Sequence, residues 1–335
     1  MFYNPAMAGD RDLAVAFATA WSADAGSGRS GWEVAAATGV RGLRLLHESG
    51  AFDRFTLTEA NREAADVLAR NTVRYPGGSA EFRDGRTAPV EGPFDYVDID
   101  PYGSPIPFLP AAFDALRAGG VLAVTATDMM VLAGVQKGAC EKRYGARPIR
   151  GRLSPEGGLR ILLAYLAREA RSRGRVVRPV LAYSRDHHVR AFVTVVAKAG
   201  APPTDPVGII DPEGWSGPKV GDRGPYGPLW LGPLFDAALV LRLAVPPSAA
   251  RPSETARFVV RLKEETLSDR PFYYESNRVA RDLGLRTPPA LAPFLAALRG
   301  RGYLAARTHA RPEGFRTTAP RAVVEEIARM LSNAS

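Results

Sequence analysis

The sequence is poor in cysteine and lysine and has no long hydrophobic run. Cys140 is the single cysteine among 335 residues, which excludes an internal disulfide and a cysteine-cluster metal site and fits a reducing compartment. No stretch of about 18 uncharged apolar residues occurs, so no membrane-spanning helix is expected. A secretory signal has a basic segment followed by an apolar one, and the first residues of this sequence do not have this pattern. We therefore expect a cytoplasmic protein with no membrane contact, and nothing indicates an obligate protein partner.

Lysine is scarce, and arginine supplies nearly all of the positive charge. Lysine accounts for five of the 44 basic residues, against 35 acidic ones. Residues 1–136 are acidic, with 17 acidic and 11 basic side chains, whereas residues 137–190 carry 14 basic and 4 acidic ones and residues 251–335 carry 15 and 9. Guanidinium groups pair with phosphates and stack on bases, so two arginine-rich blocks favour a nucleic-acid partner. A codon or stability bias remains the alternative explanation.

Short apolar runs alternate with helix-like stretches over the first two hundred residues. The strand-like runs are 32–36, 54–57, 79–82, 94–99 and 121–125, and the helix-like stretches are 42–48, 60–71, 108–118 and 158–173. This alternation predicts a doubly wound α/β sheet of mainly parallel strands. The β-rich runs 176–183 and 191–197 are separated by a polar turn, so we expect them to form an antiparallel pair that closes the sheet.

The remaining residues predict a second, smaller domain. Residues 200–233 are dense in glycine and proline and indicate a linker or an irregular subdomain. Helical periodicity returns at 234–243, and three further helix-like segments, two short strands and a closing helix follow. That pattern is typical of an α+β winged-helix-like domain. We expect a catalytic domain over 1–199, the linker over 200–233 and the smaller domain over 234–335.

A candidate nucleotide site begins where the first strand ends. Residues 35–42 are small and precede a helix, so the backbone can approach a ligand and present free N–H groups to a carboxylate. Glu59 lies twenty residues past Gly39, at the end of the next strand, where a carboxylate can accept from both ribose hydroxyls. A tight turn without a ligand and a helix-capping Glu59 are the alternatives.

The turn after the third strand adds a candidate adenine contact. Asp84 can accept from the adenine amine beside the Gly85 backbone, although a simple surface loop fits these residues as well. Nothing in the sequence matches a pyrophosphate-binding loop. A cofactor with one nucleoside and a carboxylate is therefore favoured over a dinucleotide.

The fourth strand ends in the most informative motif, Asp-Ile-Asp-Pro-Tyr-Gly-Ser-Pro at residues 98–105. Carboxyl ends of strands form the ligand crevice of an open α/β sheet, and buried acidic residues are costly unless they are paired or functional. Asp100 can take the proton of an attacking amine, and Tyr102 offers a ring on which a base can stack. A metal site is the alternative, but no histidine or further carboxylate follows at ligand spacing, so we expect no metal.

These residues resemble the tRNA guanine-N2-dimethyltransferase family, which acts on guanine 26 in archaea and eukaryotes. The similar stretches are 2–5, 10–12, 37–42, 98–105, 125–128, 142–146, 156–163, 186–190, 227–230, 308–309 and 316–317. The resemblance implies a Rossmann-like methyltransferase domain, S-adenosylmethionine as cofactor and a C-terminal domain that grips tRNA. It also implies cofactor contacts from Arg11, Arg41, Glu59, Asp84 and Gly85, with Asp100 and Tyr102 at the guanine.

Four departures from the family pattern stand out. Asp10 replaces the usual asparagine, Glu59 replaces the commoner aspartate and Tyr102 replaces phenylalanine. The cysteine zinc site that many members carry before Gly-Pro-Leu-Trp is also missing. Another fold element must therefore order the stretch 200–225, or it is held loosely.

The arginine-rich blocks supply candidate tRNA contacts, and a solvated loop is their alternative. The expected RNA-binding side chains are Arg143, Arg147, Arg150, Arg152, Arg307, His309 and Arg316. We interpret His187 and His188 as a structural turn between two strands. Methylation at another tRNA position or on ribosomal RNA, and RNA binding without catalysis, remain open, as does the choice between one and two methyl groups.

Overall fold

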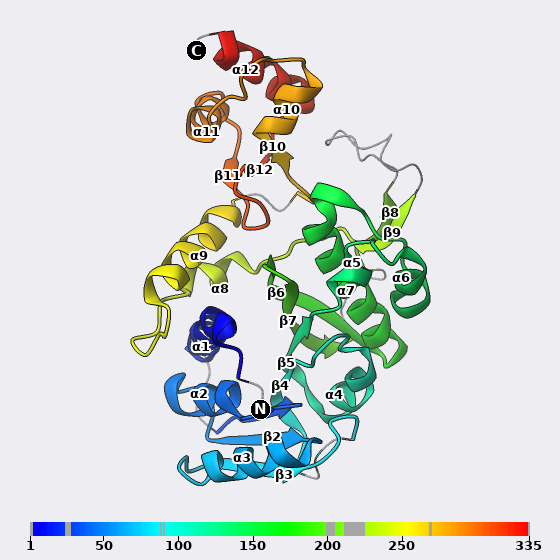
Figure 1. Ribbon diagram of the computed structural model, residues 1–335, viewed down its shortest axis with the longest axis vertical. Helices are drawn as coiled ribbons and strands as arrows, with labels where there is room; N and C mark the ends of the chain where they lie inside the picture. Colours follow the sequence, from blue (N-terminus) through cyan, green and yellow to red (C-terminus); the bar gives the residue numbers. More distant parts are fainter. Residues whose placement is uncertain are drawn as a thin grey trace.

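The computed structural model describes residues 3–23, 28–87, 89, 91–198, 205–210, 225–267 and 270–333. A large sheet with helices on both faces forms one part of the molecule, and a smaller helical part with a short sheet lies at one end of the long axis (Figure 1). Among the described residues, no helix has the length and apolar character that a membrane span requires.

The large sheet has seven strands in the order β3-β2-β1-β4-β5-β7-β6. Their bounds are β1 Ser30–Val34, β2 Arg54–Glu59, β3 Gly78–Phe82, β4 Phe94–Ile99, β5 Leu116–Ala126, β6 Arg175–Arg185 and β7 His188–Ala197. The strands β1 to β5 are parallel, whereas β7 runs antiparallel to both of its neighbours. This arrangement confirms the expected doubly wound sheet and its antiparallel closing pair.

The helices of this part follow the predicted segments with three additions. They are α1 Ala8–Ser22, α2 Val40–Glu48, α3 Arg62–Thr72, α4 Leu109–Ala115, α5 Met129–Leu132, α6 Lys137–Tyr144 and α7 Ser154–Ser172, with short 3-10 turns at Pro5–Met7, Ile106–Phe108 and Gly151–Leu153. The sequence did not predict α1, α5 or α6. Most of α1 is buried on all sides, so its sequence lacks the polar face that makes a surface helix recognisable.

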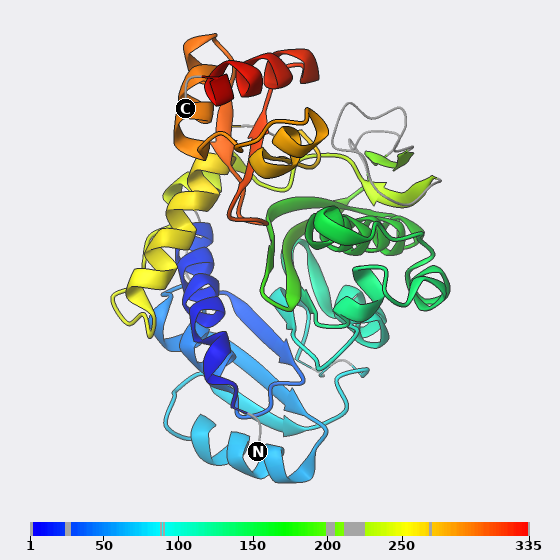
Figure 2. The ribbon, with the colours of Figure 1, turned by 45° about the horizontal axis from the view of Figure 1, so that its top comes forward.

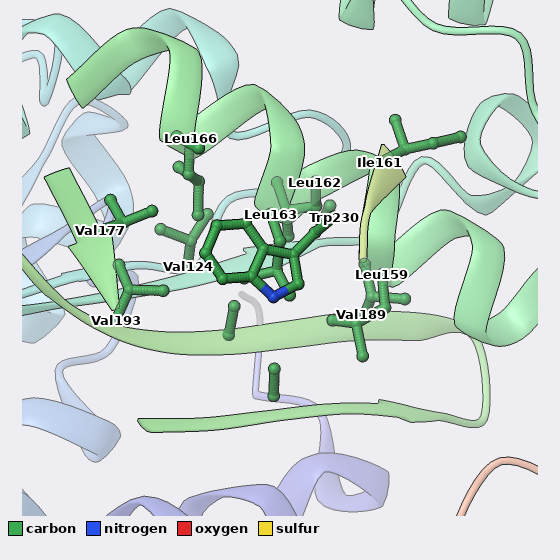
Figure 3. Close-up of a cluster of buried hydrophobic side chains, with 14 of the residues drawn as sticks. Val124, Leu159, Ile161, Leu162, Leu163, Leu166, Val177, Val189, Val193 and Trp230 are labelled. Carbon is green, nitrogen blue, oxygen red and sulfur yellow. The ribbon is translucent and has the colours of Figure 1, made fainter. Parts of the chain in front are cut away.

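Two hydrophobic clusters cover the two faces of the sheet. On one face α7 packs on β5, β6 and β7, and the indole of Trp230 lies among Leu162, Leu163 and Val124 (Figure 3). On the other face α1 and α2 pack together with two helices from much later in the chain, α8 Ala237–Arg242 and α9 Pro252–Glu265. In Figure 2 the yellow α9 runs beside the blue α1.

The C-terminal part has its own core and confirms the predicted smaller α+β domain. Its elements are β10 Tyr274–Glu275, α10 Ser276–Asp282, α11 Leu291–Gly300, β11 Ala305–Arg307, β12 Gly314–Thr317 and α12 Arg321–Asn333. The sheet order is β10-β12-β11, and Phe294 and Phe315 lie in the core between the sheet and the helices. The two-residue strand β10 was not predicted.

The boundary between the core of the large domain and that of the C-terminal domain lies after α9, and not at residue 234 as expected. Leu239 and Val240 of α8 and Val259 and Leu262 of α9 belong to the same cluster as Phe17 of α1. Before them, the hairpin of β8 Val207–Ile210 and β9 Tyr226–Trp230 lies in the expected linker. Residues 199–204 and 211–224 of that linker lie outside the described part of the chain.

Candidate active site

The candidate site is a cavity of about 650 Å³ at the carboxyl edge of the parallel strands. It is lined by Tyr3, Asn4, Met7, Arg11, Glu33, Ala35, Ala36, Ala37, Thr38, Val40, Arg41, Glu59, Asn61, Asp100, Pro101, Tyr102 and Phe108. The structure thus brings together five of the expected site residues, from α1, α2, β2 and the loop after β4. Such a cavity at the strand ends is where ligands bind in open α/β sheets.

The turn from β1 into α2 has the conformation of a ligand-binding turn even though its glycine pattern is incomplete. Ala35 and Ala37 have φ values of 55° and 50°, and Gly39, which precedes α2, has 77°. An L-residue in this left-handed region costs about 1 kcal/mol or more, and such strain concentrates at ligand sites. The turn therefore has the left-handed backbone conformation that glycines usually supply, although two of these positions are alanines.

Glu59 lies at the end of β2 and holds this turn. Its carboxylate accepts from the Ala37 N–H at 2.8 Å and from the Asn61 N–H at 2.7 Å. The helix cap is Asn61, whose side chain accepts from the Ala64 N–H, so Glu59 is not the cap of α3. Each carboxylate oxygen can accept a second hydrogen bond, and Glu59 lines the cavity, which is what binding to ribose hydroxyls requires.

Asp84 and Gly85 line a second hollow of about 350 Å³ that shares Ala35, Glu59 and Phe108 with the main cavity. Asp84 pairs with Arg86 through its carboxylate, and this ion pair lowers the pKa of Asp84 to about 2. A side chain at position 85 would lie 2.3 Å from Val34 Cγ1, so the backbone here passes directly against the core. The hollow has the size and the acceptor that a planar, amine-bearing ring would need.

Arg11 reaches the cavity from α1. Its guanidinium donates to the Asn4 carbonyl at 3.0 Å and lies over the Tyr3 ring at 4.7 Å. Burial lowers the pKa of Arg11 below its ordinary value, although a guanidinium stays charged at any working pH. The residue is therefore a fixed positive charge in the cavity wall.

The acidic end of β4 is paired with two arginines from different elements. Arg41 lies 2.6 Å from Asp100 and 3.4 Å from Asp98. Arg190 of β7 donates to Asp98 at 2.6 and 3.1 Å, and Tyr96 donates to the same carboxylate at 2.7 Å. Burial raises the pKa of Asp98, but the two arginines more than offset it and hold the pKa below its ordinary value.

Glu33 is a site residue that the sequence reasoning missed. It lies on β1 directly opposite Asp98 in the sheet register, lines the cavity, and accepts from the Gly42 N–H at 2.9 Å. Burial, reinforced by the charge of Asp98, raises its pKa to about 8 despite Arg41. An acidic residue inside an apolar strand just before the turn was the available signal. We call Glu33, Arg41, Asp98, Asp100 and Arg190 the cavity cluster.

Buried nitrogens of the cavity cluster remain unsatisfied. Within the described part of the chain, the Nε atoms of Arg41 and Arg190 have no hydrogen-bond partner. A neutral Glu33 carboxyl and an unpaired Arg41 nitrogen beside an open cavity fit a polar ligand that brings its own charges. The residues present therefore suit a cofactor with a nucleoside and an amino-acid end.

Tyr102 follows Asp100 and is fully exposed, at 103% of its reference area. It lines the cavity next to Asp100, on a loop where Gly103 has a φ of 95°. An aromatic ring with no covering side chains offers both faces to a planar base. A proton acceptor and a stacking ring therefore lie side by side at the mouth of the cavity.

The first group of expected RNA contacts lies between α6 and α7. Arg143 is 41% exposed and pairs with Asp128 at 2.6 Å, and Arg150 is exposed. Arg147 is half-buried, with its guanidinium over the Tyr226 ring at 5.6 Å. Arg152 is also half-buried and lies 3.9 Å from Glu275 of the smaller domain. The outward-facing charge of this group is therefore concentrated in Arg143 and Arg150.

The second group is placed differently from the expectation. Arg307 is half-buried, whereas the side chains of His309 and Arg316 are 1% and 2% exposed. Arg316 pairs with Glu156 at 2.8 Å and with Glu265 at 2.6 Å. His309 lies 2.6 Å from Glu265. These two side chains are therefore buried between the two parts of the molecule and are paired with carboxylates, so they expose almost no surface to a partner.

Glu156, Arg160, Glu265, His309 and Arg316 form what we call the junction cluster. Glu156 of α7 binds Arg160 at 2.6 Å and accepts from the Phe272 N–H at 2.7 Å. His309 accepts from the Ser184 N–H at 3.1 Å through Nε2. The cluster joins α7, α9, β6 and the C-terminal hairpin in one network.

The two neighbouring histidines also divide between surface and interior. His187 is exposed, whereas His188 is buried and its Nε2 lies 3.1 Å from Asp10. Burial raises the pKa of Asp10, but His188 and Arg185 outweigh it and lower the pKa to about 2. This contact ties the start of β7 to α1.

Among the described residues, no group of three or more His, Cys, Asp or Glu side chains could hold a metal ion.

The sheet order and the strand-end cavity define a Rossmann-like methyltransferase fold. The chain belongs to the N2,N2-dimethylguanosine tRNA methyltransferase family, which it matches over residues 1–204 and 220–329. This membership confirms the resemblance of the motifs.

Similar proteins support the assignment over the whole chain. A tRNA (guanine(26)-N(2))-dimethyltransferase of Thermococcus kodakarensis is 35% identical over 98% of this chain and 92% of its own length. One of Pyrobaculum calidifontis is 34% identical over 99% and 92%. The structure of Trm1 from Pyrococcus horikoshii with S-adenosyl-L-methionine superposes with a TM-score of 0.85 at 29% identity, covering 97% of this chain and 94% of that one.

Proposed function

We propose that this protein transfers one or two methyl groups from S-adenosylmethionine to N2 of guanine 26 in tRNA. The observation that carries the proposal is the pair Asp100 and Tyr102 at the mouth of the cavity. Family membership and the named activity of the relatives support the same reaction.

The cavity residues divide into two sets for this reaction. When bound, S-adenosylmethionine supplies an electrophilic methyl group. Glu59 would accept from its ribose hydroxyls, Asp84 and Gly85 would address its adenine, and Arg11 and Arg41 would hold its carboxylate. These side chains fix the donor, and positioning supplies most of the acceleration of such a transfer.

Asp100 and Tyr102 serve the guanine. Tyr102 stacks on the base, and Asp100 accepts a hydrogen bond from the exocyclic amine. As the amine nitrogen gained the methyl group that the cofactor supplies, Asp100 would take up the proton that the nitrogen releases. Arg41, which lies 2.6 Å from Asp100, holds the carboxylate in place at the mouth of the cavity.

The tRNA partner rests on the arginines as well as on the family. Arg143, Arg147, Arg150 and Arg307 are the expected contacts that keep an exposed or half-buried side chain outside the junction cluster. We propose that they bind the phosphate backbone, with Arg152 next to them at the domain junction. A tRNA substrate also keeps the cytoplasm as the expected place of action.

The test is methyl transfer from labelled S-adenosylmethionine to unmodified tRNA transcripts, with a G26A transcript alongside. We expect N2-methylated guanosine in the first transcript and none in the second. Labelling that survives the substitution would move the target to another position or RNA. Absence of labelling in any RNA would instead favour an RNA-binding protein without catalysis.

A further inference from the structure

A chain of hydrogen bonds from residues outside the cavity holds the loop that carries Tyr102. The Gly103 N–H donates to Thr127 Oγ1 at 2.6 Å, and the Thr127 N–H donates to the Gly103 carbonyl at 3.0 Å. Ser104 Oγ lies 3.1 Å from the Tyr144 hydroxyl, which donates to Asp128 Oδ1 at 2.8 Å. Because a hydroxyl has one hydrogen, Tyr144 accepts from Ser104.

Tyr144 is a rigid anchor for this chain. It is fully buried, its carbonyl accepts from Arg168 at 2.5 Å, and its ring meets that of Tyr165 edge-on at 5.7 Å. The second oxygen of Asp128 pairs with Arg143 at 2.6 Å. The hydroxyl of Tyr144 thus connects Ser104 of the catalytic loop to this buried framework.

The exposure of Tyr102 gives these contacts a consequence for catalysis. Since its ring is fully exposed, the ring's place depends on the backbone of the loop and on its own side-chain torsions, without support from neighbouring side chains. On one side of the ring Arg41 fixes Asp100, and on the other Thr127 and Tyr144 fix Gly103 and Ser104. A misplacement of about 1 Å can cost a factor of about 100 in the rate of such a transfer.

We propose that Tyr144 and Thr127 are positioning residues for methyl transfer, which hold the loop so that Tyr102 and Asp100 meet the guanine in a reactive arrangement. This inference rests on the proposed function. Neither residue touches the cavity, so both act through the loop.

The test compares three substitutions that each remove few atoms. Tyr144→Phe removes the hydroxyl that binds Ser104 and Asp128, and Thr127→Val removes the acceptor of the Gly103 N–H. Tyr165→Phe is the matched control, because Tyr165 packs on the same ring but its hydroxyl interacts with Glu169 on α7. Single-turnover methylation at saturating tRNA and S-adenosylmethionine, KM for tRNA, cofactor affinity and thermal unfolding are measured for each.

We expect the single-turnover rate to fall about tenfold in Tyr144→Phe and in Thr127→Val, with KM for tRNA and cofactor affinity within about twofold of wild type. Tyr165→Phe should match wild type in every measurement. A 2-aminopurine at the target position should be quenched less in the two loop variants, since its stacking on Tyr102 is less ordered.

Unchanged rates in both loop variants, with active wild-type protein, would overturn the inference and leave the proposed function intact. An equal loss in Tyr165→Phe would also overturn it, because the effect would then come from packing around α6. A wild-type protein that methylates no RNA would overturn the proposed function itself.

Discussion

The cavity cluster and the junction cluster are both buried groups of charged residues, but their charges are balanced differently. In the junction cluster every carboxylate oxygen of Glu156 and Glu265 accepts at least one hydrogen bond. Against the effect of burial, Arg316 and Arg160 hold the pKa of Glu156 below its ordinary value, and His309 and Arg316 do the same for Glu265. In the cavity cluster, burial raises the pKa of Glu33 to about 8, and Arg41 keeps an unpaired Nε.

The difference separates a structural joint from a binding site. A network in which every group is paired fixes its elements and offers nothing to a ligand. A network with a neutral carboxyl and a free donor beside a cavity stays incomplete until a ligand supplies the missing partners. Between these two clusters, incomplete pairing beside a cavity is therefore the difference that fits a binding site.

The largest effect expected in the cavity cluster follows from Asp100→Asn, which keeps the shape of the side chain but removes the proton acceptor. The single-turnover rate should fall by a factor of about 10² to 10⁴, with cofactor affinity changed by no more than about twofold. Asp114→Asn, at a side chain that is 73% exposed on α4, is the control and should be as active as wild type. Full methylation by Asp100→Asn would remove the assigned role.

The junction cluster should respond in stability. Arg316→Met leaves Glu156 and Glu265 buried without their main partner, so the free energy of unfolding should fall by about 3–5 kcal/mol. Arg301→Met breaks an ion pair with Glu326, whose side chain is 61% exposed, and should cost less than about 1 kcal/mol. Urea unfolding curves measure both, and equal losses would mean that the junction cluster is not a structural joint.

The free energy of unfolding should also depend on pH differently in the two clusters, with smaller changes than those expected for Arg316→Met. The pKa of Glu33 rises from 4.5 to about 8 on folding, so the stability it contributes is present below about pH 4.5 and is lost as pH rises to about 8. Glu33→Gln should remove this decline, which amounts to at most about 1.4 kcal/mol per pH unit. The pKa of Glu265 is lowered, so this group stays ionised from pH 5 to 8, and Glu265→Gln should destabilise the protein but leave the decline caused by Glu33 in place.

Urea unfolding of the two variants and of wild type at pH 5, 6.5 and 8 tests this contrast. If the wild-type and Glu33→Gln stabilities run parallel across this range, Glu33 is ionised in the folded protein and the cavity cluster is more completely balanced than the geometry indicates.

The smallest effect concerns an arginine outside both clusters. Arg150→Gln should weaken tRNA binding a few-fold and reduce the slope of log K against log salt by about 1, as loss of one phosphate contact does. Arg117→Gln is the control, because Arg117 pairs with Asp95 at the amino ends of β4 and β5, away from the carboxyl ends that form the cavity. An unchanged slope for Arg150→Gln would place the tRNA backbone elsewhere.

The sequence predicted the sheet and the reactive loop because their signals are local. Strands β1 to β5 appear as short apolar runs, and Asp100 and Tyr102 follow β4 within three residues. The helix α1 was missed because its apolar residues surround it, and Glu33 because the carboxylate that faces it, Asp98, belongs to a later strand.

Partners that are far away in the sequence also explain why two of the expected RNA-binding residues are buried. Arg316 and His309 looked like surface charges of a basic hairpin, since the acidic partners that bury them, Glu156 and Glu265, lie in other segments. The roles of Arg11, Arg41, Glu59, Asp84 and Gly85 at the cofactor, and of Asp100 and Tyr102 at the guanine, remain predictions.

The contact between α1 and α9 constrains the order in which the protein can be made. Asp12 of α1 accepts from the N–H groups of Ala250 and Arg251, which precede α9, and from the hydroxyl of Thr255 in its first turn. A ribosome releases α1 early, but the helix that completes its apolar surroundings ends at Glu265. The methyltransferase core therefore stays open for most of translation, with Phe17 and its neighbours available to chaperones until the last fifth of the chain emerges.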